Sequence, residues 1–380
     1  MKNEIYYSSI SIKRIIIKTF LILFIINFGW IFMSKLSIGN LSLYNSVFTG
    51  RSRLPFGENT KRSNNLSLYN LDAMFASHEI SKKQLDTEYL HVVLIGDSSI
   101  WGFLQEPDNT LSGLLNNRFL KIGEKVIFHN LGYPSISILK DLMVIDRALE
   151  YNPDLFLWFT TLEALPAKKQ LEIPIVGNNP LIVNSIIEKY ELSEINTLEE
   201  DLFENTLWNQ RRNIYDLLNL QLLGILWNAT GIDQEYSETY NPAQRDFPEP
   251  LEQYYAVNKY DSLKDFLALD IIKNGIEFNN GIDFILINEP ILISEGINSA
   301  VQYNYYYPRW AYDQYRSIMK EFTHENDIKY YDLWKIIPER EFTNSAIHLS
   351  EHAERLLTDE IALIVKDYMG QKVNNDNEEE

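Results

Sequence analysis

The sequence contains no cysteine among its 380 residues. This absence excludes disulfide bonds, catalytic thiols and thiolate metal sites, but it leaves the compartment open, because a protein without cysteine tolerates oxidising and reducing surroundings alike. Basic residues are few: 34 Lys and Arg stand against 53 Asp and Glu, for a net charge of -19. So acidic a chain repels phosphates, and we expect no nucleic-acid partner. No glycine-rich phosphate loop occurs, and no cofactor is implied.

The chain does have a regular alternation of apolar, strand-like runs and amphipathic segments. Strands are predicted at 91–95, 125–130, 154–159, 283–288 and 328–331, and helices at 137–149, 310–322 and 350–368. This alternation predicts an α/β fold of the flavodoxin-like, three-layer α/β/α kind, with a mostly parallel five-stranded sheet. We expect a large helical insertion in it and a transmembrane helix before it.

The α/β body is expected to cover residues 86–370, interrupted at 166–281 by an insertion with helical patches at 199–208 and 211–227. An insertion after the third strand would lie above the carboxyl edge of the sheet, where it would form a lid or merely add packing. Residues 35–85 are rich in Ser, Asn, Gly and Arg and are expected to form a stalk. The acidic tail at 371–380 is expected to be disordered.

One long hydrophobic run lies near the N-terminus. Residues 19–34 carry no charge, and residues 15–17 extend the run past Lys18. A membrane span needs about 20 residues, and a lysine can extend its ammonium to the interface, so 15–34 is predicted to be a transmembrane anchor. Basic residues in 1–14 favour a cytoplasmic N-terminus and a body outside the cytoplasm, although three basic residues beyond the run oppose this bias. A cleaved signal peptide, which lacks a small-x-small site here, and a buried core helix are the alternatives.

Ser98 comes directly after the first predicted strand, in the turn Gly96-Asp97-Ser98. A serine at the carboxyl edge of a parallel sheet is held by the scaffold and open to solvent, as a nucleophile must be. A serine hydroxyl also needs an adjacent base and a third group that orients the base. His348, just before the last predicted helix, is the candidate base.

In sequence order, these features resemble the SGNH (GDSL-like) hydrolase family, from about His91 to about Tyr368. The resemblance implies that Ser98 is the nucleophile and that its backbone amide donates to the oxyanion. Gly132, after the second predicted strand, resembles the glycine of the family's second block, which implies that its amide is a further oxyanion donor. His348 resembles the histidine of the last block, which implies that it is the base.

Two blocks depart from the family's pattern. The third should read Gly-x-Asn-Asp, but Thr160 and Thr161 follow the third predicted strand. Their hydroxyls would have to replace the missing asparagine amide, or backbone amides alone must suffice, and losing one such donor costs about 2.7–4 kcal/mol. The last block normally has an aspartate three or four residues before its histidine, where this chain has Ser345 and Asn344. Asn344 would orient the imidazole without stabilising its charged form, and weak activity is expected.

Seven aromatic side chains lie between Tyr303 and Tyr315. Such a surface suits sugars, although core packing is the commoner explanation in a chain with 13% aromatic residues.

Together these features predict a membrane-anchored, SGNH-like serine esterase or O-acyltransferase that acts outside the cytoplasm on acyl esters of cell-envelope carbohydrate. The resemblance alone implies a multi-span acyltransferase as partner. A catalytically silent, glycan-binding or scaffolding SGNH-like domain is the first alternative. The second is a zinc hydrolase, because His348, Glu351 and His352 fit the H-x-x-E-H pattern. Only 28 residues follow His352, too few for the distant third ligand, and no metal is expected.

Overall fold

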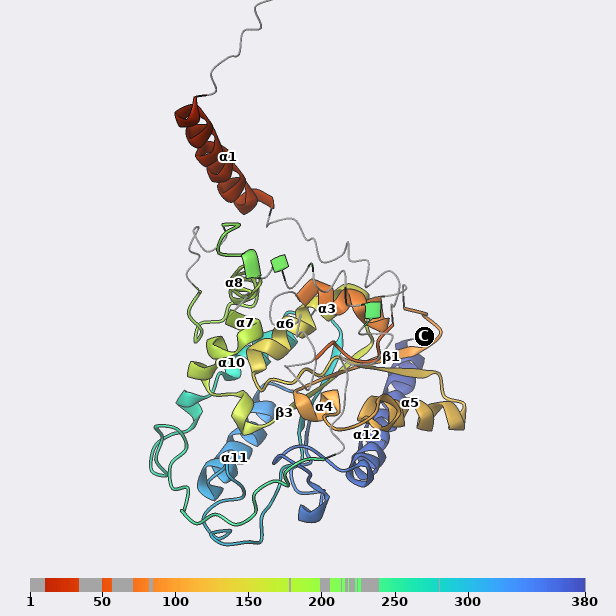
Figure 1. Ribbon diagram of the computed structural model, residues 1–380. Coiled ribbons are helices and arrows are strands. Elements are labelled where there is room, and N and C mark those ends of the chain that lie inside the picture. Colours follow the sequence, from red (N-terminus) through yellow and green to blue (C-terminus); the bar gives the residue numbers. More distant parts are fainter. Residues whose placement is uncertain are drawn as a thin grey trace, which may run out of the picture.

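The computed structural model describes residues 11–33, 50–56, 71–81, 85–177, 179–198, 206–212, 214–215, 218, 223, 225–226, 239–279 and 281–379. In this part of the chain, helices cover both faces of a five-stranded sheet (Figure 1). The strands are β1 (Leu90–Ile95), β2 (Val126–Asn130), β3 (Leu155–Thr160), β4 (Asp283–Asn288) and β5 (Tyr330–Asp332).

The strand order is β2-β1-β3-β4-β5, and every neighbouring pair is parallel. This is the flavodoxin-like order, so the predicted α/β fold is confirmed. All six residues of β3 are buried, as expected for a sheet covered on both faces. The strand order reverses between β1 and β3, and ligands of open α/β sheets bind beyond the carboxyl ends of the strands at such a point. Ser98 follows β1 there.

Side chains alternate between the two faces along each strand, which builds two separate cores. Val93 and Ile95 share one core with α6 (Ile138–Ala148) and α11 (Arg309–Glu325). Val92 and Leu94 share the other with α5 (Leu111–Ile122) and α12 (Glu351–Glu379). Thr110 caps α5, because its Oγ1 accepts the Gly113 N–H at 3.3 Å. The helices are α1 (Ile12–Met33), α3 (Leu71–Ser77), α4 (Ser98–Trp101), α5 (Leu111–Ile122), α6 (Ile138–Ala148), α7 (Pro174–Gly177), α8 (Pro180–Lys189), α10 (Leu269–Glu277), α11 (Arg309–Glu325) and α12 (Glu351–Glu379).

The expected insertion at 166–281 belongs largely to the scaffold. Its helices α7, α8 and α10 pack against α6 over one face of the sheet, because their apolar side chains join the same core. Of the two roles left open for the insertion, these three helices fulfil packing and not a lid. Tyr254 does reach the carboxyl edge, where its hydroxyl donates to Glu163 Oε2 at 3.1 Å. The predicted helical patch at 199–208 lies mostly outside the described residues, and that at 211–227 lies partly outside them.

The described parts of the expected stalk, residues 50–56 and 71–81, pack into the body instead. Arg53, Leu54 and Phe75 are fully buried, and the Trp101 Nε1–H donates to the Leu54 carbonyl at 2.8 Å. The polar composition of 35–85 concealed the few apolar side chains that hold both pieces in the core. The rest of 35–85 lies outside the described residues.

Helix α1 is the one described helix that is long and apolar enough to cross a membrane, and a signal sequence has the same properties. It begins at Ile12, three residues before the predicted start, and stands away from the body in Figure 1. At the other end of the chain, α12 continues to Glu379, although 371–380 was expected to be disordered. The helix continues into the tail because its packed part has already met the cost of nucleation. Each further residue then adds a hydrogen bond at low entropic cost.

His78 is completely buried and joins the N-terminal segment to β2. Its Nε2 lies 3.0 Å from the Asn130 carbonyl oxygen, and its Nδ1 accepts the Ile80 N–H at 3.1 Å. Both bonds require a neutral ring with its proton on Nε2. Burial is the main reason that the pKa of His78 falls to about 4.

We expect the free energy of unfolding to fall as the pH drops from about 6.5 to about 4. In this window His78 is protonated in the unfolded chain but not in the folded one, so acid favours unfolding, by roughly 3 kcal/mol in full. Denaturant unfolding of the parent and His78→Gln at several pH values measures the effect. The variant should depend less on pH, and an equal dependence would contradict the assignment.

Candidate active site

Ser98 lies at the first position of α4, immediately beyond β1. Asp97 caps this short helix, because its Oδ1 accepts the Ser99 N–H at 2.8 Å. Gly102 ends the helix with a φ of 84°, a left-handed conformation that glycine adopts without strain. Gly96 has no room for a side chain, since a Cβ would lie 2.6 Å from Ile100 Cγ1. The sequence from Gly96 to Gly102 therefore fixes one sharp turn at the carboxyl edge of the sheet.

The structure brings Ser98, His348 and Asn344 together in one chain of hydrogen bonds. The Ser98 Oγ lies 2.7 Å from His348 Nε2, and His348 Nδ1 lies 2.7 Å from Asn344 Oδ1. An amide oxygen only accepts, so the imidazole proton is on Nδ1 and points at Asn344. Nε2 is then free of a proton and can accept that of the Ser98 hydroxyl. This is the arrangement of a nucleophile, a base and an orienting group.

His348 is buried, and the ring of Phe103 stacks on it with 4.6 Å between ring centroids. Burial lowers the pKa of His348 to about 4, so the ring is neutral at pH 7 and is able to accept a proton. No carboxylate faces Nδ1; its partner is the neutral amide of Asn344. His348 is therefore a weak base, because its environment disfavours the protonated ring.

We expect the acidic limb of kcat/KM on a neutral ester to have its midpoint near pH 4. His348 must be neutral to act as the base, and its lowered pKa sets the pH at which activity is lost. Initial rates across the acidic range measure the midpoint, and circular dichroism at each pH separates it from unfolding. A midpoint near 6.5 would show that the ring is solvated in the active protein.

Gly132 was predicted to donate its amide to an oxyanion, but that N–H is already used. It donates to Asn130 Oδ1 at 3.0 Å, while Asn130 Nδ2 donates to the Ile100 carbonyl at 2.8 Å. A Cβ on Gly132 would lie 2.5 Å from the Trp101 nitrogen. Gly132 is therefore required for the close approach of the β2 loop to α4, and not as an oxyanion donor.

Of the other predicted oxyanion donors, the Ser98 amide fits the role and the hydroxyls of Thr160 and Thr161 do not. Thr161 Oγ1 is 3.1 Å from the Tyr307 hydroxyl, and Thr160 Oγ1 is buried with no hydrogen-bond partner among the described residues. Neither hydroxyl forms a hydrogen bond with Ser98 in the described part of the chain. The Ser98 amide does qualify, because the first N–H groups of a helix have no carbonyl partner within it.

Ser345, the second predicted orienting residue, faces another partner. The Tyr305 hydroxyl lies 3.3 Å from Ser345 Oγ and accepts the Ala346 N–H at 3.0 Å. Ser345 makes no hydrogen bond to His348 in the described structure, and the orienting role rests with Asn344.

The geometry contradicts the zinc alternative. The H-x-x-E-H pattern needs both histidines on one face of a helix, but α12 begins at Glu351, after His348. His348 uses both ring nitrogens for Ser98 and Asn344, and His352 is exposed.

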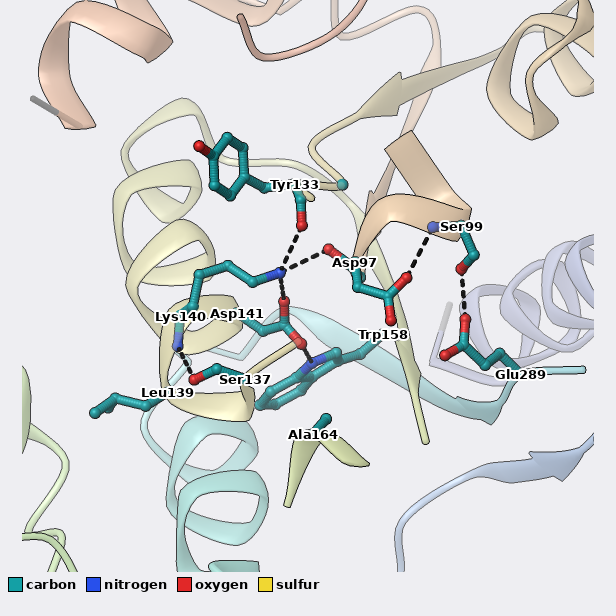
Figure 2. Close-up of polar contacts among 12 residues, drawn as sticks. Asp97, Ser99, Tyr133, Ser137, Leu139, Lys140, Asp141, Trp158, Ala164 and Glu289 are labelled. Atoms are coloured by element: carbon teal, nitrogen blue, oxygen red, sulfur yellow. Dashed lines mark hydrogen bonds and ion pairs between the residues drawn. The ribbon is translucent and has the colours of Figure 1, made fainter. Parts of the chain in front are cut away.

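The buried carboxyl groups of Asp97 and Glu289 lie on either side of Ser99 (Figure 2), and Glu289 was missed from the sequence. The Ser99 hydroxyl donates to Glu289 Oε2 at 2.5 Å, and Asp97 holds the Ser99 N–H. Burial raises the pKa of Asp97, and burial together with the negative charge of Asp97 raises the pKa of Glu289 well above its usual range. Burial therefore favours the protonated, neutral form of Glu289. Because Glu289 follows β4, this bond ties the α4 turn to a second strand end.

Lys140 supports the same turn from α6. Its Nζ donates to the Gly96 carbonyl at 2.7 Å and forms an ion pair with Asp141, as Figure 2 shows. Trp158 of β3 donates its Nε1–H to Asp141 Oδ2 at 3.2 Å. Burial raises the pKa of Asp141 to about 6 despite the lysine. The Lys140–Asp141 pair has further hydrogen bonds to Gly96 and Trp158, and it thus fixes the backbone just before Ser98.

Arg53 supports the far end of α4. Its Nη1 lies 3.3, 3.1 and 3.1 Å from the carbonyl oxygens of Trp101, Gly102 and Gln105, and its guanidinium carbon lies 4.0 Å from the centroid of the Trp101 ring. The Trp101 carbonyl ends α4 and has no partner within the helix, so the arginine supplies a donor. The Gly102 carbonyl also accepts the Gln105 N–H at 3.0 Å.

The aromatic cluster predicted to bind sugar is mostly core. Tyr307, Tyr312 and Tyr315 are fully buried, and the last two donate to Asn288 Oδ1. Tyr305 and Tyr306 are half-buried, and the Tyr305 hydroxyl lies 3.3 Å from Ser345 Oγ, one residue along the chain from Asn344.

Sequence reasoning missed Arg53, Lys140 and Glu289. Glu289 carried a signal, since a polar residue directly after a buried parallel strand lies at the edge where ligands bind. Lys140 lies within an amphipathic helix, where a buried lysine looks like any surface lysine. Arg53 belonged to a stretch whose composition is that of a linker.

No family model matches the chain, and no curated protein matches it. Solved structures do. One is a psychrotrophic esterase from Pseudoalteromonas sp. (TM-score 0.37, 11% identity, 74% of this chain and 99% of that chain). A second is a carbohydrate acetylesterase family member from Sinorhizobium meliloti (TM-score 0.33, 12% identity, 74% and 99%). A third is a member of the lipolytic protein G-D-S-L family from Veillonella parvula (TM-score 0.33, 10% identity, 70% and 93%). Many of the solved structures to which this chain is similar are thus G-D-S-L family proteins and carbohydrate acetylesterases.

Proposed function

We propose that this chain is a membrane-anchored serine esterase or O-acyltransferase of the SGNH type, acting on acyl esters of cell-envelope carbohydrate. The observation that carries the proposal is the pair of 2.7 Å contacts linking Ser98 Oγ, His348 and Asn344 at the carboxyl edge of the sheet. Such an arrangement suits nucleophilic catalysis, in which the histidine takes the proton of the serine hydroxyl while the oxygen attacks a carbonyl carbon.

In the proposed reaction, Ser98 Oγ bonds to the ester carbonyl carbon and its proton passes to His348 Nε2. The Ser98 amide donates to the oxygen that becomes negative. His348 returns the proton to the leaving alcohol, which leaves the acyl group on Ser98. Water then regenerates the serine in an esterase, or a carbohydrate hydroxyl does so in an acyltransferase, with His348 removing the proton of the attacking oxygen in either case.

The membrane and the partner belong to the proposal. Helix α1 would span the membrane with the N-terminus in the cytoplasm and the α/β body outside it. The sequence resemblance favours a carbohydrate acceptor and a multi-span acyltransferase as partner. A catalytically silent, glycan-binding domain stays the alternative, because the orienting carboxylate is missing and the oxyanion hole is short of donors.

Labelling with a fluorophosphonate separates the two functions. The full-length protein, in detergent, should be labelled at Ser98 and should hydrolyse a short acyl ester, whereas Ser98→Ala should do neither. Ser345→Ala is the matched control, because it removes a hydroxyl at the same edge that does not touch His348. A parent protein that equals Ser98→Ala in both assays would leave the silent domain as the function.

A further inference from the structure

Part of the insertion lies against α1, far from the reactive residues. The Leu207 N–H lies 3.3 Å from the Asn27 carbonyl oxygen, and the Trp208 N–H lies 2.8 Å from Asn27 Oδ1. Asn27 belongs to the apolar helix, whose large hydrophobic side chains from Ile12 to Ile26 are exposed. The segment that begins at Thr206 therefore starts at the surface of the helix proposed to span the membrane.

Beyond this contact, large apolar side chains are turned outward. Trp208 is 67% exposed and Tyr215 is 62% exposed, and three leucines are exposed as well. We name the insertion face by its described residues: Trp208, Arg211, Tyr215, Leu218, Leu223 and Leu226. Elsewhere in the described body, exposed large apolar residues are more scattered along the chain. A group of exposed apolar side chains within so short a stretch marks a surface that another apolar phase covers.

The charge of this segment differs from that of the whole chain. Residues 206–227 contain two arginines, at 211 and 212, and one acidic residue, Asp216, in a chain with a net charge of -19. Both arginines are exposed, and the guanidinium of Arg211 lies 5.0 Å from the centroid of the Trp208 ring. Tryptophan with arginine at one end of an apolar segment is typical of the interface between lipid headgroups and acyl chains.

We propose that the insertion face lies in the outer interface of the membrane beside α1, with its apolar side chains among the acyl chains and its arginines at anionic headgroups. The proposal rests on the proposed membrane anchoring by α1. A lipid surface is favoured over a protein partner because the face is continuous, through Asn27, with a helix whose apolar side chains are also uncovered. The same lipid would cover both.

A second attachment would restrict the motion of the body. A single helix leaves a domain free to rotate about its linker, whereas contact at the insertion face fixes its tilt to the membrane plane. The carboxyl edge that holds Ser98 would then keep one orientation to the bilayer, and with it the direction from which an acyl donor or acceptor approaches.

The absence of cysteine allows a direct test. Single cysteines at Tyr215 and Leu218 of the full chain, each carrying a nitroxide, are compared in vesicles of phosphatidylcholine with a minor share of phosphatidylglycerol. Collision with oxygen reports acyl chains, and collision with a water-soluble nickel complex reports water. Leu23→Cys in α1 is the lipid reference. Tyr260→Cys, at a position 87% exposed on the body, is the water reference.

We expect Tyr215→Cys and Leu218→Cys to follow the lipid reference, with oxygen collisions several-fold more frequent relative to nickel than at Tyr260→Cys. Values equal to those at Tyr260→Cys would overturn the proposal, and low collision with both reagents would overturn it in favour of a covering protein. If Leu23→Cys reads lipid while both insertion positions read water, only this inference fails. If Leu23→Cys itself reads water, the membrane anchor fails as well.

Discussion

Asn344→Asp should raise the kcat/KM of ester hydrolysis by about 10- to 1000-fold. The reverse change, Asp to Asn in a serine protease, costs about 10⁴ in kcat, because the carboxylate holds the productive tautomer and stabilises the imidazolium. Here the tautomer is already held, with Nδ1 of His348 2.7 Å from Asn344 Oδ1, so only the charge is missing. The gain should be smaller than the full factor, since the shortage of oxyanion donors remains.

The pH dependence of kcat/KM provides a second test of the Asn344→Asp prediction. A carboxylate beside Nδ1–H favours the imidazolium, so the acidic midpoint of kcat/KM should move upward from about 4. Ser345→Asp is the matched variant: it places the same charge one residue away, on the side chain that faces Tyr305. It should give neither gain, and Ser98→Ala supplies the blank. A folded Asn344→Asp that is no faster than the parent would contradict the role given to Asn344.

Arg53→Met should lower the free energy of unfolding by about 4 kcal/mol or more. Methionine fills much of the volume but donates no hydrogen bond, so the carbonyls of Trp101, Gly102 and Gln105 lose their arginine donor in a buried place. The Gly102 carbonyl keeps the Gln105 N–H as a donor. The other two carbonyls are left unsatisfied at about 1–3 kcal/mol each, and the stacking on Trp101 is also lost.

Denaturant unfolding measures this loss. Arg118→Met is the control, because Arg118 pairs with Asp359 at the surface, where an ion pair contributes at most about 1 kcal/mol. If Arg53→Met folds, we also expect slower labelling of Ser98, since the helix that carries it is less fixed. A loss no greater than that of Arg118→Met would show that Arg53 does not support α4.

The scaffold could be predicted from the sequence because the central strands β1, β3 and β4 are mostly apolar, as strands buried on both faces are. The three linked residues Ser98, Asn344 and His348 could be named for a related reason: each lies beside a sharp boundary between an element and a turn. Few side-chain types can serve as a nucleophile, a base or an orienting group at such a boundary. The order of these residues along the chain, compared with that of the family, assigns a role to each.

The rest depends on contacts between segments that the sequence keeps far apart. Gly132 looks like a donor until the structure shows its N–H bound to Asn130 Oδ1. Glu289 and Ser99 are 190 residues apart, and their bond exists only because β4 and β1 end at the same edge. Arg53 was assigned to a linker because the segment around it is rich in polar residues. Composition does not show that a single arginine of that segment is buried and donates to several carbonyls.

The distance along the chain between Ser98 and His348 has a consequence for biosynthesis. The two residues are 250 positions apart, and the base is encoded near the end. At roughly 5–20 residues per second, the ribosome adds His348 about 10–50 s after Ser98. Throughout that interval the hydroxyl has no base, and α12 has not yet been made to cover its face of the sheet. If the proposed function holds, a nascent chain therefore cannot use Ser98 as a nucleophile, and hydrolysis can begin only after α12 has been made and packed.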